Sequence, residues 1–253
     1  MRREPESDTS NLIELSVIIP VYNEEAIVEA SITELVSGLE TRPRLKNLRY
    51  ELIISANGCF DQTVPRVREL QKRFPKIRLL EMDEPNYGKA LRRGILAAEG
   101  EIVVCDEIDL CDLDFYEAAL DAMEAEGWDL VVGSKRLRES KDRRPLFRRV
   151  ASTGVTKLLW LATGFRGTDT HGLKALRRQA ILPIVHQCVV DKDMFASELV
   201  IRTHQDAALK AGEIPIELVE KRAPSIHLMR RVPTVLRQLV TLAWVTRVQR
   251  HRN

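Results

Sequence analysis

The sequence predicts an α/β fold in which helices cover both faces of a Rossmann-like, mostly parallel sheet. Short apolar segments alternate along the first half of the chain with segments whose apolar residues recur at helical spacing. Polar loops rich in carboxylates or amides follow three of the apolar segments, at residues 21–25, 56–63 and 106–112. Ligands of such folds bind beyond the carboxyl ends of the strands, so these three loops predict one binding site.

Each strand is predicted from an apolar run bounded by turn residues, and each helix from apolar residues on one face. The first run, LSVIIPVYN, ends at Pro20 and Asn23, and Gly100 suits the C-terminal cap of the third helix. In chain order, the predicted strands are residues 15–23, 50–58, 77–81, 101–105 and 129–134. The predicted helices between them are residues 24–39, 63–74, 87–99 and 114–127.

The regular alternation ends near residue 135, where SKRLRESKDRRPLFRR has little apolar content and predicts a mobile loop. The later predicted elements are a helix at 150–163, a strand or turn at 168–177, a helix at 195–212, a strand at 214–220 and a helix at 233–249. The chain is thus divided into a disordered tail (residues 1–14), one α/β domain (15–225) and a basic amphipathic C-terminal helix (226–253).

The composition excludes several classes of protein. The 253 residues carry a formal net charge of only +2, so general attraction to nucleic acid is not expected. The four cysteines form no CxxC pair, which argues against a zinc or thioredoxin-type site and favours reduced thiols in the cytoplasm. We expect neither a secretory signal nor a membrane span, because no segment reaches the roughly 18–20 apolar residues that a span requires.

The loop after the fourth predicted strand raises the main question about function. The apolar residues of EIVVC are followed by Asp106, Glu107, Asp109 and Asp112. Unpaired carboxylates repel each other and are costly to bury, so the loop either lies in water or faces a cation. We assign Asp106 to the following turn, and Asp112 and Asp114 to the cap of the next helix.

Four segments, in this order, resemble the family 2 glycosyltransferases, which have a GT-A fold. SVIIPVYNEE is similar to the opening strand and loop of the family, and SANGCFDQT stands where it often has an Asp-Asp-Gly-Ser-x-Asp-x-Thr loop. PNYGKALRRGILAAEGEIVVCDEID resembles the helix and strand that lead to the metal-binding DxD element. GTDTHGLKALRRQAI resembles a segment of the polyprenyl-phosphate branch, which includes dolichyl-phosphate mannose synthase. The chain departs from the pattern at Ala56, where the family has the Asp that contacts the nucleotide base, and at Glu107, which begins the Glu-x-Asp pair.

The resemblance implies a metal-dependent, inverting transferase that moves a hexose from a UDP- or GDP-sugar to a polyprenyl phosphate. Glu107 and Asp109 would bind Mg²⁺ or Mn²⁺, which take oxygen ligands and stabilise a departing diphosphate, with Asp109 as the better direct ligand. Residues implied to bind the nucleotide sugar are Pro20, Tyr22, Asn23, Glu24, Asn57, Asp61, Lys89 and Glu107. Simpler interpretations remain open, since Asn23 and Asp61 also suit helix caps and Lys89 also suits a solvated helix surface.

The catalytic residues implied by the resemblance are Asp109, Asp169 and His171. Asp169 would orient the sugar or the acceptor, and His171 would reach the metal or the diphosphate. The residues implied to bind the phosphate of the lipid acceptor are Lys135, Arg136, Arg148 and Arg149, unless they form only a flexible charged loop.

Two amphipathic segments, residues 150–163 and 233–249, are predicted to lie on the inner face of a membrane, with Trp160 and Trp244 at the interface. They could instead pack on the core or on a second subunit, and the sequence does not define an oligomeric state. Two other functions stay open. One is a family 2 transferase that acts on a sugar or glycan hydroxyl, with Asp169 or another carboxylate as the base. The other is a nucleotide-sugar-binding protein without catalysis.

Overall fold

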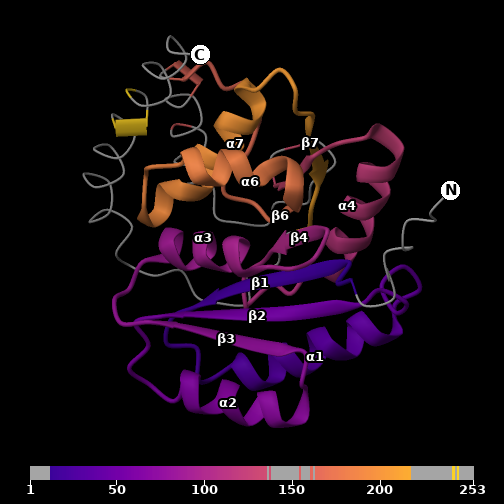
Figure 1. Ribbon diagram of the computed structural model, residues 1–253, viewed down its shortest axis with the longest axis vertical. Coiled ribbons are helices and arrows are strands. Elements are labelled where there is room, and N and C mark those ends of the chain that lie inside the picture. The colour runs from indigo at the N-terminus through magenta and orange to yellow at the C-terminus, as the bar shows by residue number, and fades with distance from the viewer. Residues whose placement is uncertain are drawn as a thin grey trace, which may run out of the picture.

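A seven-stranded sheet forms the centre of the molecule in the computed structural model (Figure 1). The structure describes residues 12–135 and 163–217, together with residues 137, 154, 160, 161, 241, 242 and 244. The strands are β1 (Leu15–Val21), β2 (Tyr50–Asn57), β3 (Ile77–Met82), β4 (Ile102–Cys105), β5 (Leu130–Ser134), β6 (Lys174–Arg177) and β7 (Ala211–Pro215). The helices are α1 (Val28–Thr41), α2 (Thr63–Arg73), α3 (Tyr87–Ala97), α4 (Leu113–Glu126), α6 (Arg178–Gln187), the 3₁₀ turn η2 (Lys192–Met194) and α7 (Phe195–Gln205).

The strand order is β3-β2-β1-β4-β6-β5-β7. β6 runs antiparallel to both of its neighbours, β4 and β5, whereas every other neighbouring pair is parallel. The prediction of a mostly parallel sheet is therefore confirmed.

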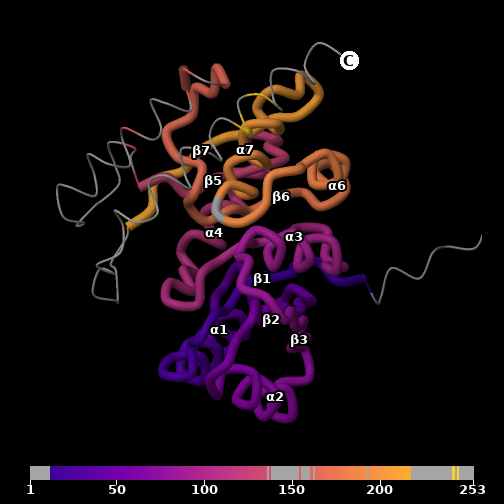
Figure 2. The backbone as a smooth tube through the Cα atoms, turned by 90° about the vertical axis from the view of Figure 1, so that its left-hand side faces the viewer, coloured from indigo at the N-terminus to yellow at the C-terminus, as the bar shows by residue number. Residues whose placement is uncertain are grey.

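Helices cover both faces of this sheet, as predicted, because alternate residues of each strand point to opposite faces. In β1, Val17 and Ile19 pack in one core with residues of α1, α2 and α4, whereas Ile18 packs in a second core with residues of α3, α6 and α7. Figure 1 shows α1 and α2 on one side of β1–β3 and α3 on the other, and Figure 2 shows α6 and α7 on the α3 side.

The predicted boundaries are wrong at two helices. The first helix begins at Val28 rather than residue 24, because the amide of Glu24 donates to the Thr63 hydroxyl at 2.6 Å and holds residues 24–27 as a turn. The helix predicted at 195–212 ends at Gln205, where Asp206 accepts a hydrogen bond from the amide of Ala208 at 2.9 Å. This early end allows β7 to begin three residues before the strand predicted at 214–220.

The sequence analysis missed α6, whose interior contains Pro183, a residue that usually ends a helix. Residues 13 and 14, assigned to the tail, already pair with the sheet through the amides of Glu101 and Ile102. Most of the predicted segments 135–149, 150–163 and 226–253 lie outside the described residues. No helix among the described residues is long and apolar enough to cross a membrane.

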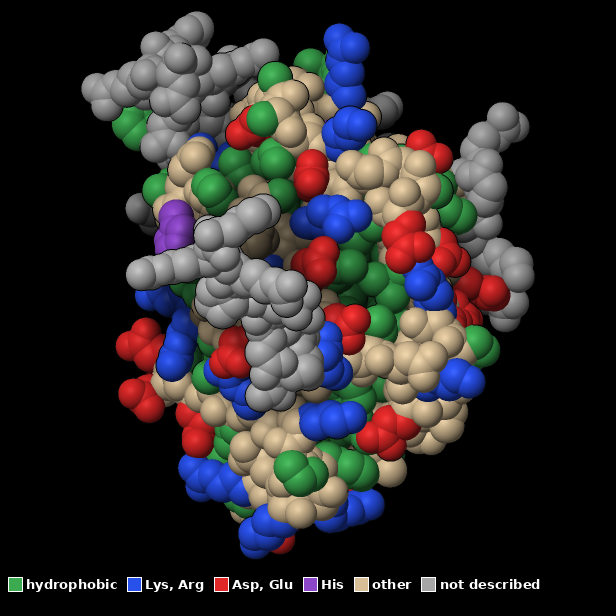
Figure 3. Space-filling model, turned by 45° about the vertical axis from the view of Figure 1, so that its right-hand side comes forward, with side chains coloured by type: hydrophobic (Ala, Val, Ile, Leu, Met, Phe, Trp, Pro, Cys, Tyr) green, Lys and Arg blue, Asp and Glu red, His purple; other side chains and the backbone are tan. Residues whose placement is uncertain are grey.

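Positive and negative side chains are interspersed over the face in Figure 3, in keeping with the small net charge. Ion pairs also join α4 to the residues after α1, where Arg44 bonds Asp121 at 2.9 Å and Arg42 bonds Glu117 at 3.1 Å. These exposed pairs fasten α4 to α1, and each contributes little to stability by itself.

Candidate active site

The candidate site lies where the parallel strands reach their carboxyl ends. The loops after β1, β2 and β4 meet there because these three strands are neighbours. β6 enters from the same edge, and its Lys174 pairs with Cys105 of β4. The residues that precede β6 therefore lie beside the acidic loop that follows β4. The two segments with the predicted metal-binding and catalytic residues thus converge in the fold.

Asp106 holds the acidic loop together from inside. It is 1% exposed, and its Oδ1 accepts a hydrogen bond from the amide of Glu107 at 2.6 Å. Its Oδ2 accepts from the amide of Asp112 at 3.1 Å and from the Tyr116 hydroxyl at 2.6 Å. Burial raises the pKa of Asp106 to about 7. As predicted, the carboxylate of Asp106 serves the turn, and the metal-binding prediction rests on Glu107 and Asp109.

The ends of the loop match the predicted caps in part. Asp112 caps α4 by accepting a hydrogen bond from the amide of Phe115 at 3.0 Å, as expected. The same prediction for Asp114 is wrong, because its exposed carboxylate pairs with Arg42 instead.

Glu107 and Asp109 fit a cation that takes most of its ligands from elsewhere. Glu107 is exposed and Asp109 is half-buried, and both follow the end of β4. Within the described residues, no group of three or more His, Cys, Asp or Glu could hold a metal ion. Mg²⁺ and Mn²⁺ suit such a site, because they bind one or two carboxylates and fill their shells with water and phosphate oxygens. The residues therefore fit an ion that binds together with a diphosphate.

The loops after β1 and β2 are braced against each other by amide side chains. Asn57 is buried, and its Nδ2 donates to the Val21 carbonyl at 2.9 Å while its Oδ1 accepts from the Asn86 amide at 3.1 Å. Asn23 has a positive φ of 54°, and its Oδ1 accepts from the amide of Phe60 at 3.0 Å. The alternative interpretation of Asn23 as a helix cap is therefore wrong, since its side chain fastens the neighbouring loop and α1 begins only at Val28.

Asp61 completes this bracing. Its Oδ1 accepts from the amide of Thr63 at 2.9 Å and its Oδ2 from the amide of Glu25 at 3.1 Å. Burial acts to raise the pKa of Asp61, but the hydrogen bonds from Thr63 and Glu25 outweigh it, and the pKa is lowered. Both carboxylate oxygens accept hydrogen bonds from backbone amides. This favours the capping interpretation of Asp61 over direct contact with the nucleotide.

The braced loops present an aromatic pair to solvent. Tyr22 is 43% exposed and Phe60 is 81% exposed, and their rings meet edge to face with centroids 6.2 Å apart. The resemblance implies that Tyr22 contacts the nucleotide, and Phe60 lies beside Tyr22 at the same end of the sheet. Pro20 is buried within β1 and Glu24 is half-buried at the start of the loop, so their contacts with a nucleotide stay predictions.

Lys89 lies at the N-terminal end of α3, which Asn86 caps by accepting from the amide of Lys89 at 3.0 Å. Its Nζ is 3.6 Å from Asp191, and the same Asn86 oxygen accepts from the amide of Lys192 at 3.0 Å. The segment before α7 is thus fixed to the start of α3. Half of the Lys89 side chain remains exposed, so its role toward a phosphate stays a prediction.

The turn that carries Asp169 is held from both sides. Glu213 of β7 accepts from the amide and the hydroxyl of Thr168 at 2.6 and 2.5 Å, and from the amide of Asp169 at 3.3 Å. The Thr168 hydroxyl also lies 2.5 Å from that of Ser134 in β5. His171 Nδ1 lies 3.3 Å from the Ser197 hydroxyl of α7. The sequence carried no local signal for Glu213, because its role depends on β7 lying next to β5.

The fold brings Asp169, in the turn before β6, close to Lys135, which directly follows β5. Asp169 is 5% exposed, and its Oδ2 lies 3.8 Å from Lys135 Nζ. Burial by itself raises the pKa of Asp169, but the Lys135 charge and the hydrogen bond from the His171 amide outweigh it, so the pKa is lowered. Of the four predicted phosphate-binding cations, Lys135 is described, and Arg136, Arg148 and Arg149 lie outside the described residues.

Lys174 is a buried cation that the sequence analysis did not single out. It is 3% exposed, and its Nζ donates to the Gly172 carbonyl at 2.6 Å. Burial lowers the pKa of Lys174, although the negative charges of Asp169 and Glu107 act against this. Its backbone pairs with Cys105 at the end of β4, so Lys174 lies between the acidic loop and the Asp169 turn.

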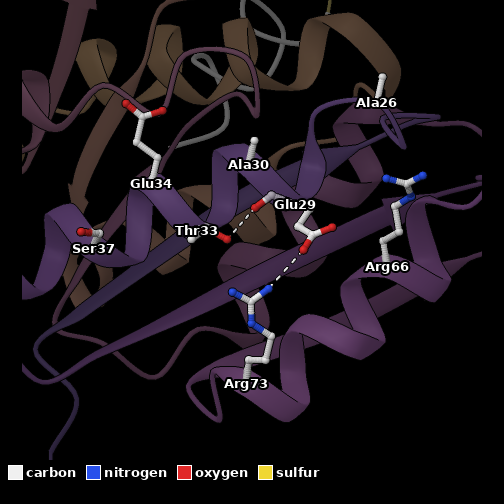
Figure 4. A pocket seen from close by; sticks show the side chains of 8 residues that line it. All are labelled: Ala26, Glu29, Ala30, Thr33, Glu34, Ser37, Arg66 and Arg73. Carbon is white, nitrogen blue, oxygen red and sulfur yellow. Dashed lines mark hydrogen bonds and ion pairs between the residues drawn. The ribbon is translucent and has the colours of Figure 1, made fainter.

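Two other features of the molecule are a buried ion pair in α7 and a groove between α1 and α2. Glu198 and Arg202 of α7 form a buried ion pair at 2.7 Å, and Glu198 also accepts from the amides of Val189 and Val190. An open groove of about 640 Å³ runs between α1 and α2, and Figure 4 shows Arg73 bonded to Glu29 across it. The groove contains none of the predicted site residues; it is lined by Ala26, Glu29, Ala30, Thr33, Glu34, Ser37, Arg66 and Arg73.

The chain matches the sequence model described as "Glycosyl transferase family 2" over residues 16–185. A dolichyl-phosphate beta-glucosyltransferase from Drosophila melanogaster is 30% identical over 230 residues, which cover 85% of this chain and 70% of that protein. Glycosyltransferase AglD from Haloferax volcanii is 26% identical over 96% of this chain, which spans only 39% of AglD. Glucosyl-3-phosphoglycerate synthase from Mycobacterium tuberculosis, solved with Mn²⁺, UDP and glucosyl-3-phosphoglycerate, has a TM-score of 0.59 at 20% identity and shares the fold over 91% of this chain and 80% of its own.

Proposed function

Since this chain belongs to glycosyl transferase family 2, we propose that it transfers a hexose from a nucleoside diphosphate sugar to a polyprenyl phosphate with the help of a divalent metal ion. The observation that carries the proposal is the convergence of the acidic Glu107–Asp109 loop with the Asp169 turn. The likeness to a dolichyl-phosphate beta-glucosyltransferase supports a lipid phosphate as the acceptor. The Mn²⁺ and UDP bound by the structural neighbour support a UDP-sugar and Mn²⁺ as the first donor and metal to test.

In the proposed reaction, an oxygen of the acceptor phosphate attacks the anomeric carbon from the side opposite the diphosphate. The bond from that carbon to the diphosphate oxygen breaks, and the nucleoside diphosphate leaves with the bonding electron pair. A divalent ion held by Glu107 and Asp109 would offset the charge that develops on the diphosphate. Asp106 keeps the loop that carries both carboxylates in one conformation.

The lowered pKa of Asp169 favours a phosphate acceptor over a hydroxyl acceptor. A hydroxyl must lose a proton, and a base is most effective when its pKa lies near the working pH. The Lys135 charge and the hydrogen bond from the His171 amide outweigh burial and lower the pKa of Asp169, which makes this carboxylate a weaker base. A phosphate oxygen is already anionic and needs no base. The basic residues that follow β5, from Lys135 to Arg149, would supply the charge that attracts it.

Exposed apolar side chains support association with the surface of a membrane, where a lipid phosphate would be found. Trp160, Leu161 and Trp244 are 52%, 64% and 67% exposed. Tryptophan favours the interface between lipid and water, and the nearby basic residues favour anionic lipid. Co-sedimentation with anionic vesicles tests this part, and Trp160→Ala with Trp244→Ala should weaken it.

The function is tested by incubating the protein with radiolabelled UDP- and GDP-sugars, Mn²⁺ and a short polyprenyl phosphate, followed by extraction into organic solvent. We expect label in the lipid fraction, and loss of transfer when Asp109 is replaced by Ala. Asp121→Ala, an exposed aspartate of α4 paired with Arg44, serves as the matched control. Label in a water-soluble glycan would favour the hydroxyl acceptor, and binding of nucleotide without any transfer would favour a protein that only binds nucleotide sugars.

A further inference from the structure

We infer that Glu198 is a positioning residue whose buried carboxylate fixes the connector, residues 188–192, against the start of α3. The connector leads from α6 into η2. The inference rests on the proposed function, because the start of α3 and the loops after β1 and β2 are predicted to face the nucleoside diphosphate. In this role Glu198 contacts no substrate. It acts through the connector and links α7 to the side of the site that binds the donor.

The carboxylate of Glu198 is fully buried in the first turn of α7 and has donors on both oxygens. Its Oε2 accepts from the amides of Val189 and Val190 at 2.9 and 2.7 Å. Its Oε1 accepts from Arg202 Nε at 2.7 Å. Burial of a carboxylate requires such donors, and hydrogen bonds to an ionised group are stronger than those between neutral groups. The connector is therefore firmly bonded to α7 through this side chain.

Lys192, at the far end of the connector, is held against α3. Its amide donates to Asn86 Oδ1 at 3.0 Å, and the same oxygen caps α3 by accepting from the amide of Lys89. A Cβ added at Gly88 would lie 2.3 Å from the Lys192 carbonyl oxygen, so the close approach depends on a glycine. Lys192 also has a positive φ of 57°, a conformation that persists only where the surroundings hold it. Contacts at both ends thus hold the connector in place.

Asn86 joins the connector to the loops that are predicted to face the nucleoside. Its amide donates to Asn57 Oδ1 at 3.1 Å, and Asn57 Nδ2 donates to the Val21 carbonyl at 2.9 Å. Asn57 and Asn86 are 4% and 9% exposed, so these bonds are shielded from water. Displacing the connector removes one of the two amides that hold Asn86 Oδ1. The hydrogen bonds between the ends of β1, β2 and α3 are weakened as a result.

The connector also sets the position of Lys89, the cation predicted to meet a phosphate. Lys89 Nζ lies 3.6 Å from Asp191, which directly follows the two residues bonded to Glu198. Both side chains of this pair are about half exposed, so the pair contributes little to stability. It does direct a flexible ammonium group to one place, and binding groups must be held to within about 0.5 Å. Loss of the bonds to Glu198 should therefore weaken binding of the diphosphate.

The neighbouring residue of α7 contacts the other side of the site. Ser197 Oγ lies 2.9 Å from the Thr170 hydroxyl and 3.3 Å from His171 Nδ1, in the turn before β6. That turn has its own hydrogen bonds to Glu213. We therefore expect loss of the Glu198 carboxylate to affect the donor side of the site and to leave the turn before β6 in place.

Two double variants separate the hydrogen bonds to the connector from the stability of the ion pair. In Glu198→Met with Arg202→Met, apolar side chains of similar length replace the pair, and the two connector amides lose their acceptor. In Glu198→Gln with Arg202→Met, the glutamine carbonyl oxygen still accepts from both amides, and no arginine opposes its NH₂ group. Removing both charges of a buried ion pair together avoids the large cost of leaving one unpaired, so both proteins should fold.

The measurement is calorimetric titration of both double variants with UDP and with GDP in the presence of Mn²⁺. The variant with methionine at position 198 should bind nucleotide at least about tenfold more weakly than the variant with glutamine there, because small displacements of positioning groups have large effects. Hydrogen exchange at the Lys192 amide should be faster in the former alone. In transfer assays, its Michaelis constant for the sugar nucleotide should rise by about tenfold, and that for the polyprenyl phosphate by less than about twofold.

A second pair of variants disturbs the connector from its other end and leaves Glu198 unaltered. Gly88→Ala presses on the Lys192 carbonyl and should weaken nucleotide binding by about tenfold. Gly94→Ala is the matched control on the same helix, because its Cβ would lie 2.3 Å from the side chain of Ile18 and away from the connector. It should change nucleotide binding by less than about twofold.

Equal nucleotide binding by the two double variants, when the unaltered protein binds UDP or GDP, would overturn the positioning role and leave the proposed function intact. Equal losses for Gly88→Ala and Gly94→Ala would do the same, as would an equal rise in the Michaelis constants for both substrates. Failure of the unaltered protein to bind either nucleotide would instead refute the proposed function, and the role of Glu198 with it.

Discussion

Replacing Asp106 by Ala should destabilise the protein far more than replacing its partner Tyr116 by Phe. Asp106→Ala removes the acceptor of three donors: the Tyr116 hydroxyl and the amides of Glu107 and Asp112. An orphaned buried donor costs about 1–3 kcal/mol. Tyr116 is fully buried, whereas Glu107 is exposed and Asp112 is half-buried, so their amides can regain water in part. The expected loss in the free energy of unfolding is about 3–4 kcal/mol.

Tyr116→Phe removes one hydrogen bond and leaves the carboxylate with its two amide donors, so about 1–2 kcal/mol should be lost. Urea unfolding monitored by circular dichroism measures both variants. Asp114→Ala is the matched control, because this neighbouring carboxylate is 83% exposed and its ion pair is worth about 0–1 kcal/mol. Equal losses for Asp106→Ala and Tyr116→Phe, or a loss for Asp106→Ala no larger than that of the control, would show that Asp106 does not hold the loop.

Three further predictions concern the same edge of the sheet. Gly172→Ala should lower the free energy of unfolding, measured with urea, by at least about 3 kcal/mol, or prevent folding. The reason is that the added Cβ would lie 1.8 Å from the Gly133 carbonyl oxygen. An unchanged free energy of unfolding would refute this close contact between the two glycines. Asn57→Asp should cost about 1–3 kcal/mol and weaken nucleotide binding, since a carboxylate would face the Val21 carbonyl where an amide now donates; unchanged values in both assays would contradict the bracing role. The pKa of Asp169 is lowered on folding, so its contribution to stability is present above its unfolded pKa of about 3.9 and is lost as the pH falls below it. As the pH falls, the free energy of unfolding should therefore decrease more steeply for the unaltered protein than for Asp169→Asn. An equal decrease for both proteins would count against the lowered pKa of Asp169.

The sequence predicted the first half of the fold well because most of its strands are buried on both faces. Runs such as Val17–Ile19 have no polar residue to obscure them, and the helices between them carry one clear apolar face. The later elements depend on tertiary contacts. β7 is defined by pairing with β5, and α6 contains Pro183, which local propensity counts against a helix.

The residues of the candidate site also fall into two groups, those that the local sequence marks and those that only tertiary contacts bring to the site. Glu107, Asp109 and Asp169 could be identified because a resemblance to known segments marks them in the sequence. Their supporting residues could not, because Glu213 reaches the Asp169 turn only through the sheet, and Lys174 becomes a site residue only when β6 pairs with β4. Hydrogen bonds within the loops also decided which polar side chains serve the backbone, as Asp61 does, rather than a ligand.

The central claim is that the acidic loop after β4 binds a metal-held diphosphate while sugar passes to a lipid phosphate. Transfer of labelled hexose to a short polyprenyl phosphate, measured with Mn²⁺, after chelation by EDTA, and in the Asp109→Ala variant, tests it most directly. We expect lipid-linked product with the metal, almost none after chelation, and recovery when Mn²⁺ is restored in excess. We expect Asp109→Ala to remain inactive at every concentration of metal. Transfer that proceeds equally with EDTA, or in Asp109→Ala, would contradict the account.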